Sequence, residues 1–293
     1  MSLVRDIQGQ FKMQDNALIK IILINILVYV IDCLIWLAGE FSGTDLFVSV
    51  LKFQALPSDF FAFLAKPWTL ITYAFSHETP SPFHIFFNMV GLYWFGDLIR
   101  EYINSRRLIS LYFMGAFAGA IFYLLAFNLI PFYMKDNQSL FLIGASASVL
   151  SIVVGAATLL PDYHFNLVIF GRVKITYIAA FYVFMSFISI TGWNAGGNLA
   201  HLGGALSGFV FIKLLKKGTD VGKPVLAVVD FTGRLFKRGK KVRMSFLNSA
   251  PPVDANYIPN QEEIDLILDK ISRSGYESLT KEEKQKLFKA SQK

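Results

Sequence analysis

Four polar side chains that can act together in acyl transfer lie in three apolar segments of the chain: Ser146, His201, His84 and Asn88. A serine hydroxyl becomes an effective nucleophile when a neighbouring base takes its proton, and histidine is the commonest such base. The oxyanion formed during acyl transfer needs donors already in place, which His84, Asn88 and the backbone N–H of Ser146 can supply. No Asp or Glu lies near His201 in the sequence. The pattern therefore favours a Ser–His dyad, with a third partner from elsewhere in the chain left open.

Ser146 lies in an uncharged run of twenty residues, FLIGASASVLSIVVGAATLL, long enough to cross a bilayer as one helix. Small residues in such a helix usually serve close helix packing. At about 100° per residue, one narrow face carries Gly144, Ser148, Ser151 and Gly155. Ser146 lies roughly 200° from Gly144, so this packing face does not account for it. A hydrogen bond back to the carbonyl of Leu142 is the structural alternative to a nucleophile.

The other three candidates have structural alternatives of their own. A histidine at the mouth of a span, such as His84, is often only interfacial, and Asn88 can join two membrane helices by a hydrogen bond. His201 is harder to explain in this way, because an ionisable residue inside a membrane span is by default a functional hypothesis.

The composition indicates a polytopic membrane protein. Of the 293 residues, 54% are hydrophobic and 17% charged, whereas a soluble domain carries about a quarter charged residues. The single cysteine, Cys33, excludes an intrachain disulfide, and no CxxC pair or zinc-finger spacing is present. We expect neither a cofactor nor a metal site.

The apolar runs predict an all-α membrane protein with six transmembrane helices. They cover residues 17–38, 83–99, 108–130, 141–160, 175–190 and 198–215. Residues 39–81 mix aromatic residues with single charges and four prolines, which is typical of short interfacial pieces. The predicted domains are a cytoplasmic N-terminal segment (1–16), the membrane domain (17–216), a basic linker (217–255) and a small helical C-terminal module (256–293).

The basic residues predict the topology. Eight Lys or Arg lie in the N-terminal segment and the loops on its side, three lie in the opposite loops, and seventeen follow from Lys213 onward. The positive-inside rule then places both termini in the cytoplasm. This excess indicates topology and lipid contact rather than nucleic-acid binding. Spans two, four and six would enter from the outer face, and Ser146 would lie about 8 Å below it, five residues into its helix.

These residues resemble the motifs of the rhomboid intramembrane serine proteases. Gly144-Ala145-Ser146 is similar to the family's G-x-S motif, and Ala200-His201-Leu202-Gly203-Gly204 with Gly208 is similar to A-H-x-x-G-x-x-x-G. His84 to Asn88 matches H-x-x-x-N, Asn198 stands where the family often has asparagine, and Trp68 resembles the tryptophan of the first loop. The resemblance covers residues 17–216.

The resemblance implies an intramembrane serine endopeptidase that cleaves transmembrane segments of other proteins near the outer face. The resemblance also implies that Ser146 is the nucleophile and His201 its base, and that His84 and Asn88 stabilise the oxyanion. Gly204 and Gly208 would let the sixth helix press against the fourth. A bacterial inner (plasma) membrane is the expected location, with transmembrane proteins and the lipid bilayer as partners and no nucleic acid.

Three residues depart from the family pattern. Ala147 replaces a glycine, Leu150 replaces an aromatic residue that stacks on the catalytic histidine, and Thr69 stands where arginine is frequent. They motivate the alternative of a pseudoprotease that binds membrane helices without cleaving them. A transporter or channel is a third hypothesis, which the nearly apolar middles of the spans disfavour.

The C-terminal part suggests lipid contact followed by a docking module. Residues 216–243 form a basic stretch that can lie along anionic head groups, with a solvated linker as the alternative. Two helical patterns follow, the first with Ile264, Ile267, Leu268 and Ile271 on one face. Thr280 and Glu283 predict a capping box at the start of the second. The pair resembles a small module attached to some bacterial rhomboid-family proteins, and we expect it to bind a cytoplasmic partner or to be regulatory.

Overall fold

The computed structural model describes residues 16–135, 141–167, 171–236 and 260–291. Most of the predicted N-terminal segment (1–15), the loop residues 136–140 and residues 237–255 of the predicted linker lie outside the described residues. The chain forms two compact units, residues 1–236 and 237–293.

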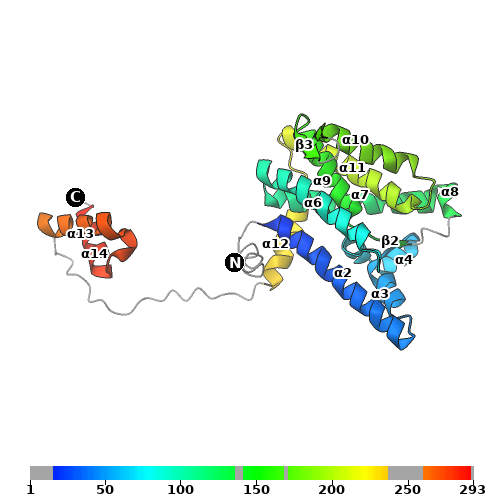
Figure 1. The fold of residues 1–293 in the computed structure, drawn as a ribbon, viewed down its shortest axis with the longest axis horizontal. Helices are drawn as coiled ribbons and strands as arrows, with labels where there is room; N and C mark the ends of the chain where they lie inside the picture. Colours follow the sequence, from blue (N-terminus) through cyan, green and yellow to red (C-terminus); the bar gives the residue numbers. More distant parts are fainter. Residues whose placement is uncertain (1–15, 136–140, 168–170, 237–259, 292–293) are drawn as a thin grey trace. The chain divides into compact units, whose positions relative to one another are not determined.

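The first unit is built mainly of helices (Figure 1). Its long helices are α2 (Ala17–Ser42), α6 (Pro82–Tyr102), α7 (Ser105–Leu129), α9 (Ser146–Leu159), α10 (Ile175–Ile188), α11 (Ala195–Lys216) and α12 (Lys223–Phe236). Short helices α3 (Leu46–Gln54), α4 (Phe60–Ala65), α5 (Thr69–Thr72) and α8 (Pro131–Met134) lie between them. The strands are β1 (Leu56–Pro57), β2 (Phe141–Leu142), β3 (His164–Leu167) and β4 (Gly171–Lys174).

Asparagine side chains cap the N-termini of three of the long helices. Asn16, Asn104 and Asn194 each accept a hydrogen bond from the backbone N–H three residues later, at 3.3, 2.9 and 3.1 Å respectively. Each bond satisfies one of the N–H groups that have no intrahelical partner at a helix start. At the other end of α2, Gly43 takes the left-handed conformation (φ 65°) that commonly ends a helix.

The core lies where α7, α9 and α11 pack together, with α6 against α9 and α10 against both α9 and α11 (Figure 1). Gly115 and Gly119 of α7 allow this contact, because a Cβ atom on Gly115 would lie 2.9 Å from the Cα of Ser148. By contrast, α2 and α10 expose many large apolar side chains, such as Leu34 and Phe181. Apolar side chains on the outside of a bundle are suited to lipid rather than water.

Three helices are long and apolar enough to cross a membrane by length and composition: α2, α7 and α11. The helices α9 and α10 are apolar but shorter, with 14 residues each. The second predicted span (83–99) corresponds to α6, which has 21 residues and carries Asp97 and Arg100 near its end. The chain is therefore a helical membrane protein, and the number of six spans stays a prediction.

The fourth helix begins later than the apolar run in the sequence. Phe141 and Leu142 form β2, which pairs antiparallel with β1 (Leu142 opposite Leu56), and α9 starts at Ser146. Gly144 between them has φ 119°, a conformation that residues with a side chain rarely adopt. The prediction of one helix over 141–160, with Ser146 five residues inside it, was therefore wrong at its first turn.

Residues 39–81 form short helices rather than one long helix, as predicted, and hydrogen bonds fasten them to the bundle. Their interfacial location stays a prediction. The Tyr73 hydroxyl donates to the Ala116 carbonyl at 2.6 Å, and the Tyr112 hydroxyl donates to the Ala74 carbonyl at 2.7 Å. The Tyr73 carbonyl accepts the Gly144 N–H at 2.9 Å. The first loop thus holds the segment that leads into Ser146.

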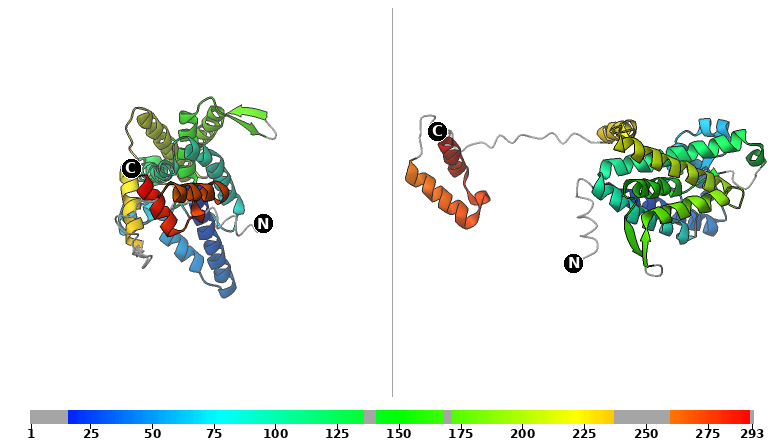
Figure 2. Two further views of the ribbon diagram at one scale, coloured as in Figure 1. Left: turned by 90° about the vertical axis from the view of Figure 1, so that its left-hand side faces the viewer. Right: turned by 90° about the horizontal axis from the view of Figure 1, so that it is seen from above.

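Part of the predicted linker forms the helix α12. Arg106 and Arg107 at the start of α7 form ion pairs with Asp230 and Asp220, the first at 2.6 Å and the second at 3.2 Å. Figure 2 shows α12 along the edge of the bundle's end, crossing the direction of the long helices. The hairpin of β3 and β4 projects from the bundle in the same views.

The second unit is a pair of helices, α13 (Gln261–Ser274) and α14 (Lys281–Ala290), joined through the 3-10 turn η1 (Tyr276–Ser278). The predicted capping box is confirmed, because the Glu283 N–H donates to Thr280 Oγ1 (3.3 Å) and the Thr280 N–H donates to the Glu283 carboxylate (2.7 Å). The predicted apolar face is confirmed in part: Ile267 is buried, whereas Leu268 is exposed.

Candidate active site

Ser146 is the first residue of α9, directly after the turn at Gly144. The first N–H groups of a helix have no intrahelical acceptor, and the helix dipole makes this end electropositive. Both effects favour a negative oxygen that forms beside the Ser146 hydroxyl. The turn that shortens the predicted helix therefore puts the hydroxyl at the end of α9 suited to acyl transfer.

His201 lies in the second turn of α11, and glycines bring α11 close to α9. A Cβ atom on Gly204 would lie 2.8 Å from the carbonyl carbon of Ala147, and one on Gly208 would lie 2.8 Å from the carbonyl carbon of Ser151. Neither position has room for a methyl group. The expected close approach of these two helices at Gly204 and Gly208 is confirmed.

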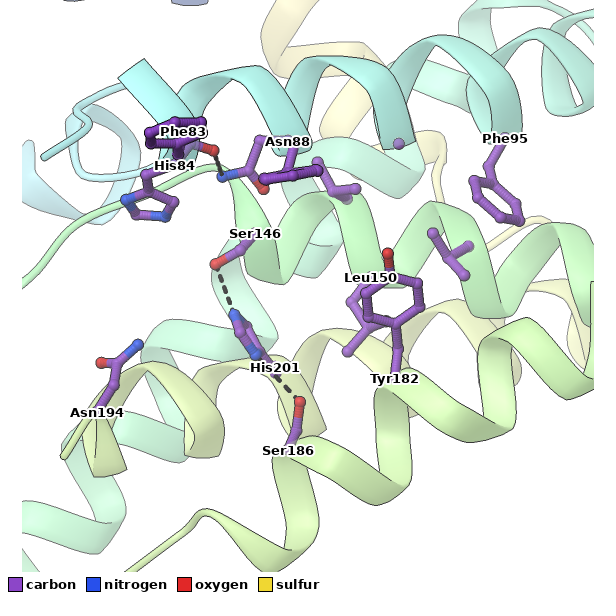
Figure 3. A pocket seen from close by; sticks show the side chains of 14 residues that line it. Phe83, His84, Asn88, Phe95, Ser146, Leu150, Tyr182, Ser186, Asn194 and His201 are labelled. Carbon is purple, nitrogen blue, oxygen red and sulfur yellow. Dashed lines mark hydrogen bonds between the residues drawn. The ribbon is translucent and has the colours of Figure 1, made fainter. Parts of the chain in front are cut away.

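The two side chains meet in a hydrogen bond. His201 Nε2 lies 2.7 Å from Ser146 Oγ, and His201 Nδ1 lies 3.1 Å from the hydroxyl of Ser186 on α10. Figure 3 shows the imidazole between the two serines, with one contact on each ring nitrogen. The distance to Ser146 is within the reach of proton transfer between a nucleophile and its base. The hydrogen bond to the Leu142 carbonyl, the structural alternative for Ser146, is not formed among the described contacts.

His84 and Asn88 come from the first turns of α6 and lie on the side of Ser146 opposite His201 (Figure 3). A Cβ atom on Gly144 would be 3.0 Å from the His84 ring and 3.6 Å from Ser146 Oγ, so the ring lies close to the Ser146 hydroxyl. Asn88 is buried, and its amide nitrogen donates to the His84 carbonyl at 2.9 Å. One of its two N–H bonds is thereby used, and the second remains available for a ligand.

An apolar cavity of about 440 Å³ joins these groups. Its polar residues are Ser146, His201, His84, Asn88, Ser186, Asn194 and Tyr182, and its apolar wall includes Phe95, Leu150 and Val153. Figure 3 shows the wall extending along α9 beyond Ser146, towards Phe95. A cavity with an apolar wall and a few convergent polar groups is typical of a ligand site. Within the described residues, no group of three or more His, Cys, Asp or Glu is placed to hold a metal ion.

His77 lies beside this site, in the connection between α5 and α6. Its ring contacts the His84 ring edge-on with 5.3 Å between centroids, and its Nδ1 lies 3.1 Å from the Phe75 carbonyl. Only 1% of its surface is exposed. Burial, and then the neighbouring His84, lower the pKa of His77 to about 4. His77 is therefore neutral at physiological pH and supports one side of the His84 ring.

The sequence reasoning missed Ser186 and His77. Ser186 stands in an apolar helix with no motif around it, and only the packing of α10 on α11 brings it to His201. His77 precedes His84 by seven residues, a spacing that suggests no contact without the turn between them.

The structure gives a local explanation for two of the three departures from the family pattern, Ala147 and Thr69. Ala147 packs where α7 has Gly119, and the buried hydroxyl of Thr69 donates to the Lys66 carbonyl at 2.7 Å.

A model of the Rhomboid domain matches residues 64–218, more than half of the chain. The chain belongs to the rhomboid family. The matched region contains the segment from α5 to α11 and hence all four predicted site residues. Residues 255–293 match a separate family of unknown function, DUF6576, which coincides with the second unit's helices.

Two relatives from Arabidopsis thaliana are similar to this rhomboid-family chain. RHOMBOID-like protein 12, mitochondrial, is 32% identical over 159 residues, which cover 51% of this chain and 47% of that protein. Rhomboid-like protein 16, chloroplastic, is 40% identical over 70 residues, covering 24% of this chain and 21% of that protein. The chain spans about half the length of the first relative.

Proposed function

We propose that this rhomboid-family protein is an intramembrane serine endopeptidase. The observation that carries the proposal is the 2.7 Å contact between Ser146 Oγ and His201 Nε2 at the edge of the apolar cavity. A nucleophile beside its base, facing an apolar cavity in a membrane protein, suits hydrolysis of a peptide bond in an apolar segment.

The proposed reaction uses each group in turn. His201 Nε2 takes the Ser146 proton as the oxygen attacks the scissile carbonyl carbon, and the protonated ring then gives that proton to the leaving amine. The oxyanion lies between the first N–H groups of α9, the Asn88 amide and the His84 ring. Water then attacks the acyl-enzyme, with His201 again as the base, and releases Ser146.

The proposed substrates are transmembrane segments of other proteins, cleaved near the outer face. We also propose six spans (α2, α6, α7, α9, α10 and α11) with both termini in the cytoplasm, as the Lys and Arg distribution predicts. The bacterial inner membrane remains the sequence-based proposal for the location. The names of the two relatives place those proteins in mitochondria and chloroplasts.

The test is labelling and cleavage by the purified protein in lipid vesicles. A fluorophosphonate should label Ser146, and a model transmembrane substrate should be cut. Ser146→Ala and His201→Ala should abolish both without changing thermal unfolding. Ser148→Ala is the matched control, because that buried hydroxyl has no hydrogen-bond partner in the described part of the chain. Cleavage retained by Ser146→Ala would refute the assignment.

The second candidate function is that of a pseudoprotease, and it is favoured by the position of Leu150. This aliphatic side chain lines the cavity where an aromatic ring would support His201. Under this hypothesis, we expect a transmembrane segment to co-purify with the wild-type protein, and we expect neither labelling at Ser146 nor a cleavage product.

A further inference from the structure

The imidazole of His201 has a hydroxyl on each of its nitrogens. Ser146 on α9 faces Nε2, and Ser186 on α10 faces Nδ1 at 3.1 Å. Ser186 is 5% exposed and lines the same cavity. Three helices therefore meet at one ring, and the sequence offers no acidic residue near His201 to take the place of Ser186.

The contact with Ser186 sets which nitrogen carries the proton. For Nε2 to accept the proton of Ser146, the neutral ring must be protonated on Nδ1. That Nδ1–H group needs an acceptor in a buried site, and Ser186 Oγ is at hydrogen-bond distance. After Nε2 is protonated, the same bond to Nδ1 persists, so the ring keeps its orientation through the transfer.

We propose that Ser186 is a positioning residue that holds His201 in the tautomer and orientation required by Ser146. This inference rests on the proposed peptidase function. Leu150, the nearby cavity residue on α9, is aliphatic and cannot hydrogen-bond the ring. The hydroxyl of Ser186 on α10 thus supports the His201 ring, which Leu150 on α9 cannot support by a hydrogen bond.

The experiment compares Ser186→Ala with Ser186→Thr, which keeps the hydroxyl. Without the acceptor, the neutral ring populates both tautomers and turns, so we expect Ser186→Ala to lower kcat about tenfold to 100-fold with KM unchanged. Ser186→Thr should restore most of the rate. In bilayers, ¹⁵N spectra of labelled histidine should show Nδ1–H on His201 in wild type and a mixture in Ser186→Ala. His201→Asn identifies the signals.

The two proposals fail in different ways. An unchanged kcat and an unchanged His201 spectrum in Ser186→Ala overturn the positioning role while the peptidase stands. A wild-type protein that neither cleaves nor reacts with the fluorophosphonate overturns the peptidase function. In that case the nitrogen spectra alone decide whether Ser186 sets the tautomer, and an unchanged spectrum rejects it.

A separate observation concerns α12, which has two opposite faces. Leu226 and Asp230 are half-buried, and Asp230 pairs with Arg106 of α7. The other face carries an exposed stripe at i, i+3, i+4 and i+7, formed by Pro224, Ala227, Val228 and Phe231. Val228 is 61% exposed and Phe231 62%. Such a stripe is typical of a helix with a second apolar contact.

The position and charge of α12 indicate what covers this stripe. The helix runs along the edge of the bundle's end and across the long helices (Figure 2). Asp230 on the opposite face pairs with Arg106 of α7, so the exposed stripe is on the side away from α7. Four exposed lysines lie in the sequence at the start of α12 or within ten residues before it: Lys213, Lys216, Lys217 and Lys223. An apolar stripe beside cations fits the boundary between anionic head groups and acyl chains. We infer that α12 lies in the plane of the membrane surface and binds anionic lipid.

The test places an environment-sensitive fluorophore on single cysteines in a Cys33→Ser background, at Val228, at Phe231 and at the exposed control Thr219. The protein is reconstituted in nanodiscs of phosphatidylcholine alone or mixed with phosphatidylglycerol. Spin-labelled lipid should quench positions 228 and 231 but not 219, more strongly with phosphatidylglycerol. Lys217→Glu with Lys223→Glu should remove this lipid preference.

Two results would overturn the lipid inference. If aqueous iodide quenches all three positions equally and spin-labelled lipid quenches none, the stripe faces solvent. If positions 228 and 231 are shielded from both quenchers, a protein surface covers the stripe instead.

Discussion

Substituting Gly208 tests whether the close contact of α9 and α11 sets the geometry of the site. A Cβ atom there would lie 2.8 Å from the carbonyl carbon and 2.9 Å from the Cα of Ser151. These are backbone atoms, which cannot turn aside as a side chain can. Ordinary carbon contacts are about 3.5–4.0 Å, so Gly208→Ala must separate the helices by roughly 1 Å. Such overpacking costs about 1–3 kcal/mol of stability.

The same displacement affects the distance from Ser146 to His201. The hydrogen bond of 2.7 Å would lengthen beyond the reach of direct proton transfer, about 3.2 Å. A misplacement of about 1 Å can lower a rate about 100-fold. We therefore expect Gly208→Ala to lower both fluorophosphonate labelling and substrate cleavage about 100-fold, together with a lower thermal unfolding temperature.

Gly155→Ala is the matched control on the neighbouring helix. The three atoms nearest to a Cβ atom on Gly155 would be side-chain carbons of Leu111 and Ile212, at 3.4 to 3.6 Å, which is ordinary contact. Its labelling rate and unfolding temperature should stay near those of wild type. If Gly208→Ala behaves like Gly155→Ala in both measurements, the close helix contact does not set the site geometry and the reasoning fails.

Two further predictions concern pH and capping. His77 has its pKa lowered to about 4, so the neutral ring contributes stability above pH 6.5 that is lost as the pH falls towards 4. The variant His77→Asn keeps a donor for the Phe75 carbonyl but has no titrating ring. Between pH 6.5 and 4, its free energy of unfolding should fall by about 3 kcal/mol less than that of wild type. Equal decreases in the two proteins would contradict this prediction. Thr280→Ala removes the acceptor of the Glu283 N–H and should destabilise the start of α14 by about 1 kcal/mol. Faster amide exchange in α14 of the full chain would show this, with Thr280→Ser as the control that restores protection.

Local chemistry made some features predictable from the sequence. The capping box of Thr280 and Glu283 depends on residues three apart on one helix, so the spacing alone decides it. Ser146 and His201 could be paired because a serine outside the packing face and an ionisable residue in a membrane span both needed an explanation. The glycines that bring their helices together are also visible in the sequence.

Features that depend on tertiary contact were not predictable. Residues 141–145 are as apolar as the helix after them, and only the pairing with β1 and the turn at Gly144 exclude them from α9. Ser186 has no sequence signal, because a serine in a membrane helix usually bonds to its own backbone. The burial of His77 depends on a turn that brings its ring to His84.

The attachment of the first loop to the segment before Ser146 has a consequence for inhibition. Leu56 pairs with Leu142, and the Tyr73 carbonyl accepts a hydrogen bond from the Gly144 N–H, so the loop is joined directly to the segment that leads into Ser146. An antibody fragment or a small molecule that pulls this loop outward would displace the hydroxyl without entering the cavity. Allosteric control of the proposed peptidase would then need only a ligand that binds the protein's surface, remote from the His201 imidazole.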